Sequence, residues 1–243
     1  MVSLKSLKLK ELLDVDWAAY FDQNAGRSMP IEDFEEEALT EAEKKLIFPT
    51  IKIFQAGEAS EGGYLMQAAD AYSSRTGDEP YAKAIRGFIR EENRHSAYLK
   101  KYMDHYEIKP CKRSWLDACF RRIRKLSGLK SEVIVLMTAE IIALSYYSAL
   151  AKCTQSPVLK AICRQMLHDE LYHIVFQSTT LYKLKSFWGE KAMRAFFMEA
   201  TLLAVWPKLR GVMTEGGYSF ERFARESLGY LRQSYKIASF CKL

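Results

Sequence analysis

Two Glu-x-x-His motifs constrain this chain more than any other feature of its sequence. Glu92 and His95 form the first motif, and Glu170 and His173 form the second. A spacing of three residues places both members of a motif on one face of a helix. Around each motif, residues taken in alternating steps of three and four are mostly apolar, which is typical of a helix face that turns toward a core. The sequence therefore predicts helices that bury acidic and imidazole groups.

Two further apolar stripes carry carboxylates of their own. One stripe, in the segment 133–147, contains Glu140, and another, in the segment 51–72, contains Glu58 and Glu61 one turn apart. A buried carboxylate is costly without a positive partner, and several in one interior repel each other. No Lys or Arg lies on the four stripes. We therefore expect a multivalent cation here, and oxygen and imidazole ligands favour iron or manganese over calcium or magnesium.

The pattern as a whole matches a known type of metal site. One glutamate from each of two helices, with a Glu-x-x-His motif from each of two others, is the ligand arrangement of di-iron carboxylate bundles. On the first helix either Glu58 or Glu61, or both, can supply the ligand. The predicted metal ligands are Glu58, Glu61, Glu92, His95, Glu140, Glu170 and His173, and all of these except Glu61 are also predicted to be catalytic.

The rest of the sequence predicts an all-α fold, because no segment alternates as a strand does. Pro49 predicts a kink or a break in the first long helix. Gly77, Asp78 and Pro80 predict the end of one helix and the start of the next. Helical periodicity covers about residues 40–75, 79–106, 131–152, 157–186, 189–210 and 219–234. The four long segments indicate two helical hairpins joined by a crossover.

Length and composition limit the class of protein. At 243 residues we expect a single domain over 1–243, with a bundle core at about 40–187 and a C-terminal helical extension at about 188–236. The net charge of +6 is modest, and no basic tract typical of nucleic-acid binding is present. Five cysteines, with no C-x-x-C pair, favour a reducing compartment. Without a secretory signal or an apolar stretch of about 18 residues, we expect no transmembrane segment and a cytoplasmic protein.

Several short segments resemble known families. EENRH at 91–95 resembles the first metal motif of soluble acyl-carrier-protein desaturases. GEASEGGY at 57–64, AEIIALSYY at 139–147 and DELYH at 169–173 are similar to segments of cyanobacterial aldehyde-deformylating oxygenases, and rubrerythrins share the same frame. The resemblance covers about residues 45–185. It implies a ferritin-like four-helix bundle with a crossover connection and extra N- and C-terminal helices.

The resemblance also implies roles for single residues. Glu92, Glu140 and Glu170 would be carboxylate ligands and the two motif histidines imidazole ligands, while the Gly-Glu pair of the similar oxygenases favours Glu58 over Glu61. By the same analogy, Asp169 would orient His95 and Glu91 would orient His173. For Glu91 a solvated surface acid is an equal alternative.

We therefore expect a non-haem di-iron oxidoreductase that activates O2 to oxidise an organic, apolar or acyl-chain-like substrate. The cofactor would be two Fe ions, with an Mn/Fe pair as the alternative, and the partners a small-molecule substrate and an external electron donor such as ferredoxin. The apolar stretch 195–206 is a candidate dimer interface, so a homodimer stays an alternative to a monomer. The alternative function is a ferroxidase, peroxidase or iron-handling ferritin-like protein. A third, metal-free interaction module would leave the buried carboxylates without compensation.

Overall fold

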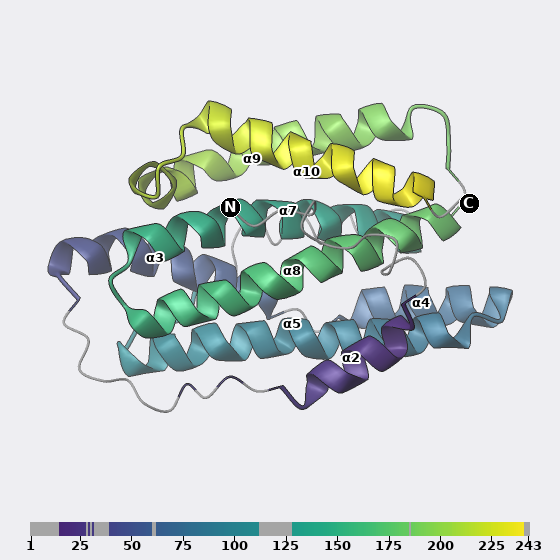
Figure 1. Ribbon diagram of the computed structural model, residues 1–243, viewed down its shortest axis with the longest axis horizontal. Coiled ribbons are helices and arrows are strands. Elements are labelled where there is room, and N and C mark those ends of the chain that lie inside the picture. The colour runs from purple at the N-terminus through teal and green to yellow at the C-terminus, as the bar shows by residue number, and fades with distance from the viewer. Residues whose placement is uncertain are drawn as a thin grey trace. The chain divides into compact units, whose positions relative to one another are not determined.

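The computed structural model describes residues 15–27, 29, 31, 39–59, 62–111, 128–184 and 186–240. Within these ranges every regular element is a helix and there is no strand, which confirms the predicted all-α class (Figure 1). One sequence prediction, the ligand role of Glu61, falls outside the described residues.

The chain divides into two compact units, each of which is built from helices. The N-terminal unit contains the described residues among 15–38 and 48–132, and the C-terminal unit contains those among 39–47 and 133–243. Helices α3 (Glu41–Glu58) and α7 (Leu129–Cys153) each run from one unit into the other. The N-terminal unit also holds α2 (Trp17–Ala25), α4 (Gly63–Thr76) and α5 (Glu79–His105), and the C-terminal unit holds α8 (Pro157–Lys183), α9 (Glu190–Glu215) and α10 (Phe220–Phe240).

The first long helical segment is interrupted at a glycine pair and not at its proline. Pro49 lies inside α3, whereas the chain leaves the helix after Glu58 and resumes helical structure at Gly63. Gly62 precedes α4 with φ +60°, in the left-handed region that glycine adopts without steric penalty. A Cβ at Gly62 would also lie 2.6 Å from Cδ1 of Ile89. The backbone conformation and this close approach both require glycine at position 62, and Glu58 is the last residue of α3.

The following helix begins where the sequence predicts. Gly77 ends α4 with φ +77°, and its N–H donates to the Ser73 carbonyl. The Asp78 side chain accepts from the N–H of Tyr81, and Pro80 lies in the first turn of α5. These groups satisfy backbone donors and acceptors that helix ends leave without partners. The long helix that carries Glu92 and His95 is therefore fixed at its start by local chemistry.

Helix α2 adds to the N-terminal unit a contact that periodicity does not reveal. The Asp16 side chain accepts from the N–H of Ala19 and so begins the helix. Phe21 is buried against Phe88 of α5, with ring centroids 6.1 Å apart. Gly87 permits this approach, because a Cβ there would lie 2.4 Å from Cβ of Phe21. An extra N-terminal helix is predicted by the sequence, and α2 is such a helix.

In the C-terminal unit, α10 packs against both α8 and α9. A buried arginine of α9 links three helices of this unit. Arg194 donates to Ser234 Oγ of α10 at 3.1 Å, and its Nη2 lies 2.8 Å from the sulfur of Met137 in α7. Its guanidinium also lies over the ring of Tyr235, 4.5 Å from the centroid. The predicted C-terminal helical extension thus forms specific contacts with α7, the helix that carries Glu140.

Helix α7 is the most apolar described helix. By length and composition it could cross a membrane, so the expectation that no stretch is long and apolar enough was wrong. Within the folded protein, 83% of the apolar 18-residue stretch of α7 is buried, as in the core helix of a soluble protein. Glu140, near the middle of this helix, is buried as well.

Two glycines of the C-terminal unit provide a matched test of its packing. A Cβ at Gly216 would lie 2.5 Å from the backbone Cα of Ala149, whereas a Cβ at Gly229 meets nothing within 4 Å. We expect Gly216→Ala to lower the free energy of unfolding by about 1–3 kcal/mol through overpacking. Gly229→Ala, inside α10, should raise it by up to about 1 kcal/mol through helix propensity. Urea unfolding followed by circular dichroism measures both, and equal effects would contradict the close approach at Gly216.

Candidate metal centre

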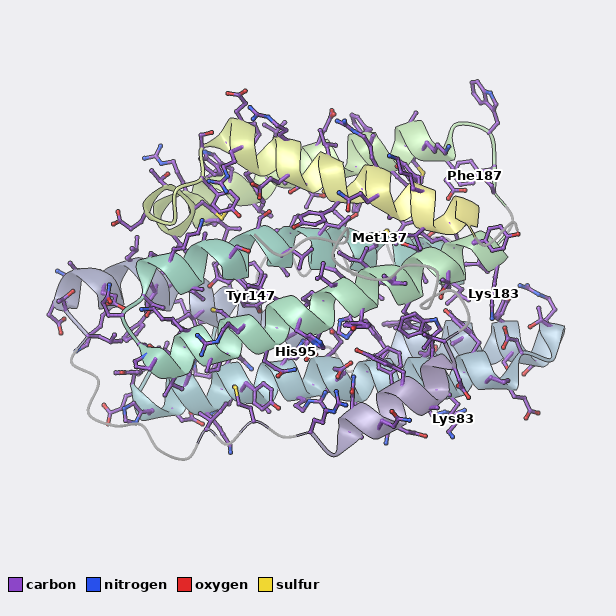
Figure 2. All side chains as sticks on the ribbon, in the orientation of Figure 1. Lys83, His95, Met137, Tyr147, Lys183 and Phe187 are labelled. Carbon is purple, nitrogen blue, oxygen red and sulfur yellow. The ribbon has the colours of Figure 1, made fainter. Side chains whose placement is uncertain are left out.

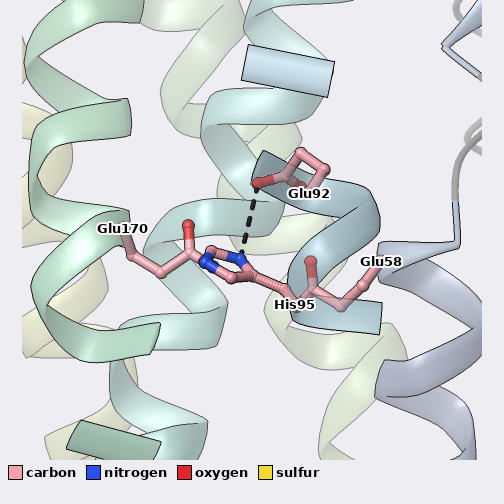
Figure 3. Close-up of side chains that lie close together, drawn as sticks. All are labelled: Glu58, Glu92, His95 and Glu170. Carbon is pink, nitrogen blue, oxygen red and sulfur yellow. Dashed lines mark ion pairs between the residues drawn. The ribbon is translucent and has the colours of Figure 1, made fainter. Parts of the chain in front are cut away.

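The N-terminal unit carries three of the predicted ligands. Glu58 is the last residue of α3, and Glu92 and His95 lie one turn apart on α5. All three side chains are buried. The Nδ1 atom of His95 lies 3.7 Å from Oε1 of Glu92, which the dashed line in Figure 3 marks. The spacing of three residues therefore brings the two groups of the first motif to one face of the helix, as predicted.

The C-terminal unit carries an equivalent set. Glu140 lies on α7, and Glu170 and His173 lie one turn apart on α8. All three are buried, and Glu170 and His173 have no exposed surface. The Nδ1 atom of His173 lies 3.2 Å from Oε2 of Glu170 and 3.5 Å from Oε2 of Glu140. One imidazole thus faces carboxylates from two helices.

These side chains form two groups that could each hold a metal ion. In each group the ligand atoms all lie within 4.8 Å of one another, and every member is buried. Figure 3 shows the first group, with its members drawn from α3, α5 and α8. Glu92 and Glu170 belong to both groups. The first group is Glu58, Glu92, His95 and Glu170, and the second is Glu92, Glu140, Glu170 and His173.

The charges of the two groups call for cations. Together the groups contain four carboxylates and two imidazoles, so that two divalent ions would balance the carboxylate charge if the imidazoles are neutral. Glu140 illustrates the need, because within the described ranges its ion-pair and hydrogen-bond partners are the imidazole of His173 and the amide of Gln177, and neither is a Lys or Arg. A buried carboxylate with no cationic partner is strongly disfavoured. The donor set, oxygen and imidazole nitrogen without sulfur, suits iron or manganese.

Gln177 is a residue of the site to which the sequence analysis gave no role. Its Nε2 donates to Oε1 of Glu140 at 3.0 Å, and the side chain is buried on α8, one turn beyond His173. Its Oε1 has no hydrogen-bond partner among the described residues. The amide fixes one oxygen of Glu140 while the other faces His173. A polar residue in the otherwise apolar stripe beyond the motif was the signal that could have identified it.

The acids next to the motif glutamates are buried too. Glu91 is only 2% exposed, which excludes the solvated surface acid considered from the sequence. It forms an ion pair with Arg94, whose Nη1 donates to the Asn24 carbonyl at 2.7 Å. Asp169 accepts from Nε2 of Gln165 at 2.9 Å and lies 3.0 Å from Nδ1 of His168. That Asp169 orients His95, and Glu91 orients His173, stays a prediction.

Comparison of the chain with known protein families, curated proteins and solved structures found no match. The residues themselves therefore indicate a metal centre. Their burial, their distances and the spacing of the two motifs support it.

The sharing of two glutamates between the groups leads to a test. Glu170→Ala removes a ligand from both groups, whereas Glu58→Ala and Glu140→Ala each remove a ligand from one. We expect the wild-type protein, loaded anaerobically with Fe(II) and desalted, to retain roughly two irons per chain. Glu58→Ala and Glu140→Ala should retain roughly one, and Glu170→Ala almost none, as measured by a colorimetric iron assay.

His105→Ala is the control, because this histidine lies in the last turn of α5 outside both groups. It should retain iron as the wild type does. Retention of a single zinc, or of no transition metal, by the wild-type protein would contradict the site.

The role of Gln177 has a separate test. Gln177→Leu keeps the size of the side chain but removes the donor to Glu140. Because groups that orient a ligand affect metal affinity, we expect the affinity for one of the two metals to fall about 10–100-fold. A competition titration with Co(II) and a chelator measures it. Gln67→Leu, at an exposed position of α4, is the matched control, and equal affinities for the two variants would remove Gln177 from the site.

Proposed function

We propose that the two groups form one dinuclear iron centre in a ferritin-like four-helix bundle, and that the protein is an O2-activating oxidoreductase. The observation that carries this proposal is that Glu92 and Glu170 belong to both groups. Two separate mononuclear sites would not share ligands, whereas shared carboxylates can hold two ions as a pair. Glu58 and His95 would complete one half, and Glu140 and His173 the other. An Mn/Fe pair is the alternative for the same ligands.

The bound metal pair would supply the redox chemistry with O2, and the chain would supply ligands, orientation and exclusion of water. Gln177 holds the Glu140 carboxylate in one orientation. Met137 and Leu144, one turn to either side of Glu140, are buried and apolar, and so are Phe88 and Leu99 around the motif of α5. Water is thereby kept from the ligands, which strengthens their electrostatic interactions.

Apolar surroundings favour an organic substrate over iron as the substrate. An iron-storage or ferroxidase protein passes ions through its site, and ions need polar groups along their path. The buried residues that flank the ligands on α5, α7 and α8 are mostly apolar. We therefore propose an apolar or acyl-chain-like organic substrate. An external reductant such as ferredoxin would return electrons after each reaction. A cytoplasmic location fits such a donor.

Iron turnover separates the oxidoreductase from the metal-handling alternative. We add a large excess of Fe(II) to the aerobic protein and follow ferric absorbance. An oxidoreductase should stop after oxidising roughly two irons per chain, because its metals stay bound, and should resume only when a reductant is supplied.

The Glu170→Ala variant, which lacks a ligand of both groups, is the background control. Growth of ferric mineral far beyond two irons per chain would support the ferroxidase or storage alternative instead. That result would leave the metal ligands in place and change only the function.

A further inference from the structure

The large apolar side chains exposed on the described protein gather in one short segment. Six of the seven lie between residues 182 and 203, and only Tyr64 lies elsewhere. Trp188 is 99% exposed, Phe196 73% and Leu203 63%. Exposed large apolar side chains that gather in one segment commonly mark a binding surface. The six residues are Tyr182, Phe187, Trp188, Met193, Phe196 and Leu203.

Helix α9 is apolar on two faces. Met198, Leu202 and Val205 are buried in the C-terminal unit. Met193, Phe196 and Leu203 are on the exposed side, at spacings of three and seven residues that keep them along one face. Large apolar side chains along an exposed helix face are commonly covered by a binding partner. The exposed face of α9 therefore calls for an apolar environment outside the C-terminal unit.

Among the described residues of 182–203, the exposed charged side chains are Lys183, Lys191 and Glu199, and the two lysines lie closest along the chain to Phe187 and Trp188. Lys183 and Lys191 are exposed, whereas the acid between them, Glu190, is buried and accepts a hydrogen bond from Ser186 Oγ at 3.0 Å. Arg194 is directed inward to Ser234. Figure 2 labels Lys183 and Phe187, at the end of α8 and in the connection to α9. We call the residues Tyr182, Lys183, Phe187, Trp188, Lys191, Met193 and Phe196 the α8–α9 patch.

We propose that the α8–α9 patch docks the protein on the surface of an anionic phospholipid bilayer. Tryptophan and tyrosine favour the boundary between headgroups and acyl chains, where an apolar ring can be buried and a polar edge stays hydrated. Lysines beside them interact with anionic headgroups while their aliphatic stems remain on apolar surface. An exposed apolar helix face with adjacent lysines is the combination that lies in a membrane interface. This inference is independent of the metal centre.

Charge and shape favour a bilayer over two other occupants. A second copy of the chain, packed through the same patch, would bring Lys183 and Lys191 toward their own copies in a symmetric contact. An acidic protein would match the charge but would need a preformed pocket for Trp188, which stands almost fully in solvent. A fluid bilayer accepts such a side chain without a pocket.

The test is sedimentation of the full-length, iron-loaded protein with vesicles. Vesicles of phosphatidylcholine are compared with vesicles that also contain phosphatidylglycerol. We expect binding to the anionic vesicles that weakens with salt, and little binding to phosphatidylcholine alone. Phe187→Ser with Trp188→Ser, and Lys183→Glu with Lys191→Glu, should each weaken binding at least about tenfold. The blue shift of tryptophan fluorescence on binding should be lost in the first double variant.

Matched controls separate the patch from general effects. Tyr64→Ser removes the exposed aromatic residue outside the patch. Arg210→Glu with Arg232→Glu makes the same change in net charge at exposed positions near the end of α9 and on α10. Both controls should bind as the wild type does. Circular dichroism and iron content should be unchanged in all four variants.

Three results would overturn the proposal. The first is absence of binding to anionic vesicles, or binding that neither double variant alters. The second is a dimer in lipid-free buffer that dissociates in the Phe187→Ser, Trp188→Ser variant, which would assign the patch to a second copy. The third is a protein that does not bind vesicles but binds a purified acidic ferredoxin in a way that depends on Trp188. That result would assign the patch to a protein partner.

Discussion

A buried carboxylate repels every other carboxylate near it unless a cation lies among them, and this constraint governs the interior of the protein. Four glutamates contribute to the two groups, and all are buried. An apolar interior strengthens repulsion as well as attraction, because little water remains to screen the charges. Gln177 supplies one neutral donor, to Glu140, which does not remove its charge. Metal binding and stability of the fold are therefore expected to be coupled.

The two groups of candidate ligands are built from equivalent parts. Each contains one single glutamate and one Glu-x-x-His pair, on helices whose remaining core positions are mostly apolar. In each unit a histidine lies within 4 Å of the glutamate of its own motif. In the second group, Glu140 also accepts a hydrogen bond from the Gln177 amide.

The C-terminal helices connect the proposed chemistry to the proposed membrane surface. Arg194 on α9 contacts Met137, which precedes Glu140 by one turn of α7. The same helix exposes Phe196, and the α8–α9 patch begins beyond the end of the helix that carries Glu170 and His173. An apolar, acyl-chain-like substrate is held by bilayers in much higher concentration than by water. The two proposals are chemically consistent, although neither depends on the other.

The sequence by itself determined the features that depend on near neighbours along the chain. The spacing of Glu92 and His95, and of Glu170 and His173, fixes their shared helix faces, and Gly77 with Asp78 fixes the start of α5. Only the tertiary structure decided what depends on residues far apart in sequence. Gly62 leaves no room for a Cβ beside Ile89, a contact between distant residues that periodicity does not record, and Pro49 is tolerated within α3. The Gln177 bond to Glu140 and the exposure of Trp188 were likewise invisible, because side-chain partners and solvent contact are set by how helices pack.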